Sequence, residues 1–118
     1  MAFRFQTLDV YKQTLRISGD IFILLNDLQQ QKEYVVADQL MRAFLSISNN
    51  IAEGSGSNSD KEFAYFINIA RRSVFECANI MTIMQIKGLI SVEIKNRYTE
   101  EFEIISRKLQ SLRKTLLT

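Results

Sequence analysis

The side chains that most resemble catalytic groups are the carboxylates of Glu53 and Glu76 and the single thiol, Cys77. An enzymatic hypothesis needs the two carboxylates to act as acid and base in one pocket. The chain has no histidine, which excludes an imidazole base, the Ser-His and Cys-His nucleophile pairs and the common zinc and haem ligands. Cys77 falls on an apolar helical stripe, which predicts a buried, inert thiol. We therefore expect no catalytic residue, no metal, no cofactor and no small-molecule substrate.

Glu76 interrupts an otherwise apolar part of its predicted helix. It would act as a general base if its pKa were raised, but a lone carboxylate near arginines is usually structural. We therefore favour an ion pair with Arg42, Arg71 or Arg72. A di-iron site of the helical-bundle type is excluded, because it needs Glu-x-x-His pairs.

Polar residues recur in steps of four, three and four along another predicted helix: Arg42, Ser46, Asn49 and Glu53, with Asn50 at the border. This spacing places them within a sector of about 60° on one helix face. The stripe is either a groove that recognises a ligand or a solvated or hydrogen-bonded face between helices. Polar stripes are ordinary on helices, so we favour the second interpretation.

The chain has 15 basic and 13 acidic residues, a net charge of +2. Residues 91–118 hold six basic and four acidic groups, so positive charge gathers near the end of the chain. Basic side chains there could neutralise phosphates without distinguishing bases, or they could simply be solvated beside an apolar stripe. In a monomer we favour solvation. In a symmetric oligomer the patch repeats, and both alternatives stay open. The candidate nucleic-acid-binding residues are Arg71, Arg72, Arg107, Lys108, Arg113 and Lys114.

Helices must position these side chains, because apolar residues recur with helical spacing almost everywhere and the chain has no proline. We expect helices over about 5–29, 32–53, 59–87 and 91–117. Short connections between four helices predict a single all-α domain over 1–118, an antiparallel up-down-up-down four-helix bundle. The first helix has two adjacent apolar stripes, which predicts that it sits centrally or contacts another subunit. Gly19 within it predicts close packing or a local bend.

The helix ends carry recognisable signals. Gly54 can adopt the left-handed conformation that ends a helix, and Gly88 ends the next one. Ser59 and Glu62 are typical of a capping box, and Ser91 of an N-cap. The longest apolar run, 21–25, is far shorter than a membrane span, and the N-terminus lacks a secretory signal. With one cysteine, these features predict a cytoplasmic protein without a membrane partner.

The segment 46–54 reads S-I-S-N-N-I-A-E-G and is followed by Gly56, by K-E-F at 61–63 and by Phe66. It resembles the hallmark of the family of proteins encoded in intervening sequences of 23S ribosomal RNA. The resemblance extends more loosely over nearly the whole chain, including the polar positions Arg42, Asn50, Glu53 and Glu76.

Relatives of this kind are small helical bundles that form ring-like homopentamers, and none is known to us as an enzyme. One branch, the accessory proteins of diversity-generating retroelements, binds nucleic acid. The resemblance therefore implies a non-enzymatic, homo-oligomeric scaffold or accessory protein, with the pentamer as the expected assembly. The alternative is an accessory protein that binds RNA or DNA through a repeated basic patch.

Three departures from the family pattern bear on that alternative. Ser48 replaces a proline, which removes a kink signal from its helix. Ser57 replaces an arginine, whereas Arg72 adds positive charge where a glycine is usual. Positive charge is thus lost near the loop after Gly54 and gained on the next helix.

Overall fold

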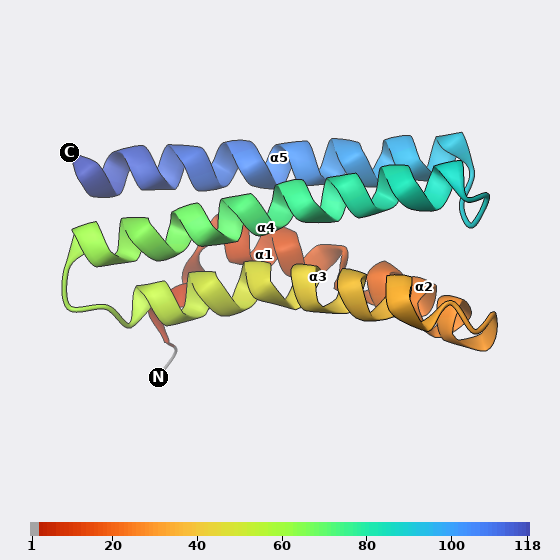
Figure 1. Cartoon of the computed structure of the whole chain (residues 1–118). Coiled ribbons are helices and arrows are strands. Elements are labelled where there is room, and N and C mark those ends of the chain that lie inside the picture. The colour runs from red at the N-terminus through yellow and green to blue at the C-terminus, as the bar shows by residue number, and fades with distance from the viewer. Residues whose placement is uncertain (1–2) are drawn as a thin grey trace.

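The computed structural model describes residues 3–118, and within that range all regular secondary structure is helical (Figure 1). The chain forms a short 3-10 helix, η1 (Arg4–Thr7), and then α1 (Asp9–Arg16), α2 (Ser18–Gln30), α3 (Tyr34–Ser55), α4 (Asp60–Ile86) and α5 (Val92–Leu117). These helices confirm the predicted all-α bundle, and the last three begin and end within two residues of the expected boundaries.

The three long helices form the frame of the molecule. In Figure 1, α4 runs antiparallel between α3 and α5, and it packs along both of them. The segments α1 and α2 supply the fourth side of the bundle: α1 contacts both α3 and α5, whereas α2 packs on α3. The bundle measures 44 × 25 × 20 Å, so it is elongated along the helix axes.

The single first helix expected over 5–29 is wrong in detail, because the chain breaks it at Ile17. The backbone of Ile17 has φ −95° and ψ −3°, so that residue ends α1 and precedes α2. Nearby hydroxyls bond to main-chain carbonyls: Thr14 donates to Val10 at 2.9 Å and Ser18 donates to Leu15 at 2.7 Å. Such side-chain bonds compete with regular helical bonding and bend helices. The bend lies two residues before Gly19, close to where the sequence placed one.

Two helix ends use the left-handed conformation. Gly88 has φ +82°, and the amide of Leu89 donates to the Met84 carbonyl at 2.9 Å, which closes α4 as the sequence predicts. Lys32 has φ +63° in the turn after α2, where the sequence offers no glycine. The amide of Glu33 donates there to the Leu28 carbonyl at 2.9 Å, the equivalent closing bond.

The predicted N-caps at Ser59 and Ser91 are confirmed, but of the capping box only the Ser59 bond is found, without the return bond from the Glu62 side chain. The hydroxyl of Ser59 accepts from the amide of Glu62 at 3.1 Å, and that of Ser91 accepts from the amide of Ile94 at 3.1 Å. Each bond satisfies a backbone donor that the first turn of a helix leaves free.

Gly54 plays a different part from the left-handed helix end that its sequence position suggests. It lies buried inside α3, and its φ is not positive. A Cβ at this position would stand 2.6 Å from the Cβ of Phe66 and 2.9 Å from Cδ1 of Phe63, both on α4. The glycine therefore allows α3 and α4 to approach closely beside their connecting loop.

A continuous apolar core fills the bundle. Of the two stripes on the first helical segment, one is inside it: Val10, Ile17, Ile21 and Leu28 are all buried. The other stripe reaches the surface at Leu15 and Phe22, which remain 46% and 49% exposed. The first helical segment is therefore not central within the chain, and the second stripe is uncovered at its middle, whereas Leu25 is buried and Leu8 and Tyr11 pack against the core.

Candidate functional site

The middle of the predicted polar stripe forms a hydrogen-bond network between α3 and α4. The Ser46 and Ser73 hydroxyls lie 2.8 Å apart across the helix interface. The Asn50 side-chain amide donates to the Ser46 hydroxyl at 2.9 Å and to its carbonyl at 2.7 Å. Ser73 is buried, so these bonds satisfy polar groups that would otherwise destabilise the helix interface. Ser46 thus joins the two helices, and Asn50 supports its hydroxyl from the same helix.

One turn closer to the N-terminus of α3, the same stripe borders a shallow polar groove of about 380 Å³. Its lining residues are Gln39, Arg42, Ala43, Ser46 and Glu76. Arg42 pairs with Asp38 on its own helix at 3.8 Å, and both side chains are well exposed. The ion pair expected for Glu76 is not found among residues 3–118, where Glu76 faces the groove as an exposed carboxylate.

The two candidate acid–base carboxylates do not share a site. Glu53 is exposed on α3 and does not line the groove that holds Glu76. Seven residues separate it from Ser46, about 10 Å along the helix axis. The geometry therefore lacks the single pocket that the enzymatic hypothesis needs.

Cys77 is buried, as its position in the apolar stripe predicts. Burial, and to a lesser degree the charge of Glu76, raises the pKa of its thiol to about 12. At neutral pH the group is therefore a neutral thiol without nucleophilic character. Within residues 3–118 there is also no cluster of side chains suited to hold a metal ion.

Three of the six basic candidates already have intrachain partners. Arg107 pairs with Glu103 at 2.8 Å on α5, and both side chains are exposed. Lys108 bridges to α1, where its Nζ lies 2.7 Å from the Asp9 carboxylate, and this partner lowers the pKa of Asp9. The guanidinium of Arg71 stacks on the Phe75 ring, 4.9 Å from its centre.

The other three candidates, Arg72, Arg113 and Lys114, form no ion pair within the described residues. Arg72 and Lys114 are exposed, whereas Arg113 is half-buried. Its Nε atom is fully covered and has no hydrogen-bond partner. The six predicted basic residues thus lie on both α4 and α5. Acidic partners neutralise the charges of Arg107 and Lys108.

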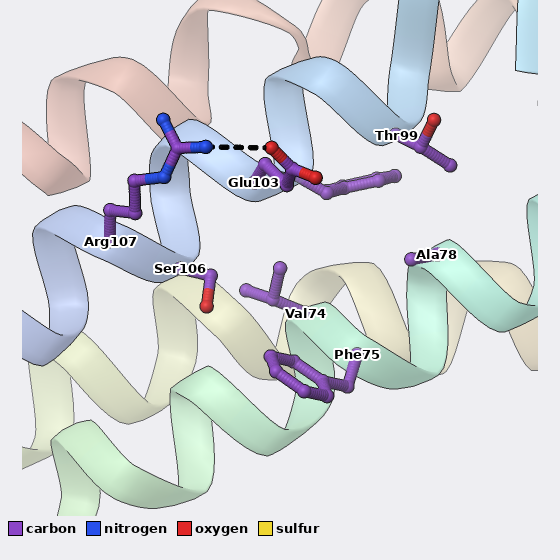
Figure 2. Close-up of a pocket in the computed structure, with 8 residues that line it drawn as sticks. Val74, Phe75, Ala78, Thr99, Glu103, Ser106 and Arg107 are labelled. Carbon is purple, nitrogen blue, oxygen red and sulfur yellow. Dashed lines mark hydrogen bonds and ion pairs between the residues drawn. The ribbon is translucent and has the colours of Figure 1, made fainter. Parts of the chain in front are cut away.

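An apolar groove of about 370 Å³ lies between α4 and α5 (Figure 2). Its floor and wall are Val74, Phe75, Ala78 and Phe102, and polar residues of α5 form the opposite rim. In Figure 2, the ion pair between Glu103 and Arg107 lies on that rim, across from Phe75. Phe75 is 57% exposed. The sequence did not predict this groove. Its one local signal was that Phe75 follows Arg71 by one helical turn, the spacing at which the two side chains stack.

Comparison with known proteins agrees with this architecture. The sequence profile of the 23S rRNA-intervening sequence protein family matches residues 6–111. The chain belongs to the 23S rRNA-intervening sequence protein family. Its fold is similar to the crystal structure of a protein of unknown function from the S23 ribosomal protein family of Bacteroides thetaiotaomicron VPI-5482. That match has a TM-score of 0.83 and 26% identity, and it covers 89% of this chain and 98% of the other. A search of curated proteins gave no match.

Membership of this family confirms the resemblance seen in the motif from Ser46 to Gly54. The structure gives that motif a physical meaning: Ser46 joins α3 to α4, Asn50 donates to Ser46 within α3, and Gly54 lets the two helices meet. These positions of the family motif therefore maintain the fold. No helix within residues 3–118 has the length and apolar character needed to cross a membrane.

Proposed function

We propose that this family member is a non-enzymatic scaffold or accessory protein that acts as a homo-oligomer in the cytoplasm. One observation carries the proposal: the middle of the second apolar stripe of the first helical segment is uncovered. Leu15 and Phe22 on it are about half exposed, and Ile23, which follows Phe22 in the chain, is 71% exposed. An exposed apolar cluster on a small protein is typical of an interaction surface.

Covering these side chains would contribute a favourable share of the free energy of assembly. Complete burial of a Leu, Ile or Phe side chain contributes about 1.5–3 kcal/mol. These three side chains retain roughly half of that contribution, so covering them adds a few kcal/mol per interface. Repetition of the interface in a closed oligomer multiplies the gain. The pentamer is the assembly that the family resemblance leads us to expect.

Light scattering coupled to size-exclusion chromatography tests this proposal. We expect the wild-type protein to elute with several times the 13.7 kDa mass of the chain. Phe22→Glu should shift the mass toward the monomer, because it places a charge in the stripe. Val35→Glu is the matched control, since Val35 is 77% exposed but lies outside the stripe. A monomeric wild-type protein at micromolar concentration contradicts the proposal.

A second candidate function is binding of RNA or DNA in an accessory role. It is supported by Arg72, Arg113 and Lys114, whose charges have no acidic partner within the described residues. In an oligomer these charges repeat around the assembly and attract phosphates.

Binding of 23S ribosomal RNA fragments at increasing salt tests this second function. We expect affinity to fall steeply with salt, and the double variant Arg113→Glu, Lys114→Glu to weaken all sequences alike. The matched control is Lys95→Glu, which reverses one charge 18 residues away on the same helix, about 27 Å along its axis. Absence of any shift at low salt contradicts this function.

A further inference from the structure

We propose that the cleft between α2 and the start of α5 binds a basic α-amino acid such as lysine. This cleft has a volume of about 330 Å³ and lies at the end of the bundle where α4 turns into α5 (Figure 1). Apolar side chains with a few convergent polar groups are the usual lining of a small-molecule site. The inference goes beyond the proposed assembly and does not depend on it.

Three charged side chains line the cleft: Asp20 and Asp27 on α2, and Arg97 on α5. None of them forms an ion pair within residues 3–118. The cleft therefore presents two anions and one cation that lack a charged partner. A basic α-amino acid carries the complementary set, two cationic groups and one carboxylate.

Two of these charged groups meet at Tyr98, a residue that also lines the cleft and is only 5% exposed. Burial raises the pKa of Tyr98, the charge of Asp20 raises it further, and Arg97 lowers it. The Arg97 guanidinium lies over the Tyr98 ring, 5.4 Å from its centre. This point of the cleft thus offers guanidinium and phenol donors for a carboxylate, next to an acceptor for an ammonium group.

Asp27 provides a second acceptor farther along the cleft. It follows Asp20 by seven residues, so the two lie on one face of α2, about 10 Å apart along its axis. The side-chain amide of Gln31 donates to one Asp27 oxygen at 2.9 Å, which leaves the other oxygen free. Hydrogen bonds of about 2.8 Å to each aspartate take up roughly half of the distance between them. A short methylene chain fills the rest, over Leu24 of α2 and Ile94 of α5, which line the same cleft.

Charge distinguishes this ligand from simpler ones. A diamine leaves Arg97 without a partner, and an aliphatic α-amino acid leaves Asp27 without one, so each forgoes a charge-assisted hydrogen bond. In the α4–α5 groove, by contrast, Arg107 is already paired with Glu103 of its own helix. No spacing in the sequence predicts the cleft, because its charges come from two helices far apart in the chain.

Isothermal titration calorimetry with L-lysine and three analogues tests the site, because each analogue lacks one charged group. Cadaverine lacks the carboxylate, 6-aminohexanoate lacks the α-ammonium group, and norleucine lacks the side-chain ammonium group. At low salt, we expect each analogue to bind about tenfold more weakly than L-lysine.

Three variants identify the partner of each group. We expect Arg97→Gln, Asp20→Asn and Asp27→Asn each to weaken L-lysine about tenfold. Arg97→Gln should not weaken cadaverine, Asp20→Asn should not weaken 6-aminohexanoate, and Asp27→Asn should not weaken norleucine, because those ligands lack the matching group. The matched controls Lys95→Gln and Asp38→Asn remove one charge of each sign outside the cleft and should bind all four ligands as the wild type does.

Several results would overturn the inference. Absence of heat with millimolar L-lysine removes the site, and equal binding of all four ligands removes the assigned contacts. A variant that circular dichroism shows to be folded but that weakens every ligand alike refutes its pairing. Nα-acetyl-lysine amide, which has neither free α-group, should bind more weakly than cadaverine. If it binds as tightly as L-lysine, the cleft accepts a lysine within a protein chain and not the free amino acid. All of these readouts are independent of the mass of the oligomer.

Discussion

Replacement of Gly54 by alanine tests the close approach of α3 and α4 that positions the polar network. The added methyl group would stand 2.6 Å from the Cβ of Phe66 and 2.9 Å from Cδ1 of Phe63. Favourable carbon–carbon contacts are about 3.5–4.0 Å, so the methyl group arrives roughly 1 Å too close. The Cβ of Phe66 is attached directly to the backbone of α4, and no change of rotamer can move it away.

The expected loss follows from two opposing contributions. Overpacking of a close-packed core costs about 1–3 kcal/mol, and rigid neighbours place this site near the upper end. Alanine gains about 1 kcal/mol over glycine in helix propensity. We therefore expect Gly54→Ala to lower the free energy of unfolding by about 2 kcal/mol.

Urea unfolding at a fixed protein concentration measures this loss, because the stability of an oligomer depends on concentration. Gly56→Ala is the matched control: its nearest contact is an ordinary 3.5 Å and its φ is −87°. We expect the control to be neutral or slightly stabilising. If Gly54→Ala is as stable as the wild type, the packing argument is refuted.

Three further predictions concern the turn after α2, the thiol and the bridge from α5 to α1. Lys32→Gly should raise the free energy of unfolding in urea by about 1 kcal/mol, because Lys32 has φ +63°; an unchanged or lower value contradicts this. Cys77 should react with a thiol reagent at pH 8 only as the protein unfolds, since burial raises its pKa to about 12; stoichiometric labelling of the native protein is the opposing result. Asp9 has a native pKa below its usual 3.8, owing to Lys108, so the bridge stabilises the fold above that pH. The contribution of the bridge is lost as the pH falls through the lowered pKa of Asp9. Asp9→Asn should therefore make the free energy of unfolding less dependent on pH in this acid range. A pH dependence identical to that of the wild type contradicts the role of the bridge.

Sequence periodicity was sufficient for the long helices and their caps. The hydroxyls of Ser59 and Ser91 start α4 and α5 where the sequence predicts, because capping depends on local chemistry. The break at Ile17 was not predictable in the same way. It occurs without proline, and although hydroxyl bonds of Thr14 and Ser18 flank it, the same kind of bond at Ser73 and Thr82 leaves α4 unbroken, so no local signal marks the break.

The site was less predictable than the fold, because spacing along one helix does not show what faces it. The stripe from Arg42 to Glu53 is regular in sequence, yet Ser73 of α4 turns its middle into a network. Gly54 has the sequence position of a helix end, but contacts with α4 determine its role. The groove at Phe75 depends on the register of α4 against α5, which the sequence of either helix alone does not specify.

The central claim is that this bundle functions by assembling, through the apolar side chains around Leu15 and Phe22 that its own chain leaves about half exposed. The most direct test is the mass of the intact particle by native mass spectrometry at micromolar concentration. We predict a single closed species with five times the 13.7 kDa mass of the chain, reduced toward one chain by Phe22→Glu. A wild-type particle of one chain mass, or a stripe variant with an unchanged oligomer, contradicts the account.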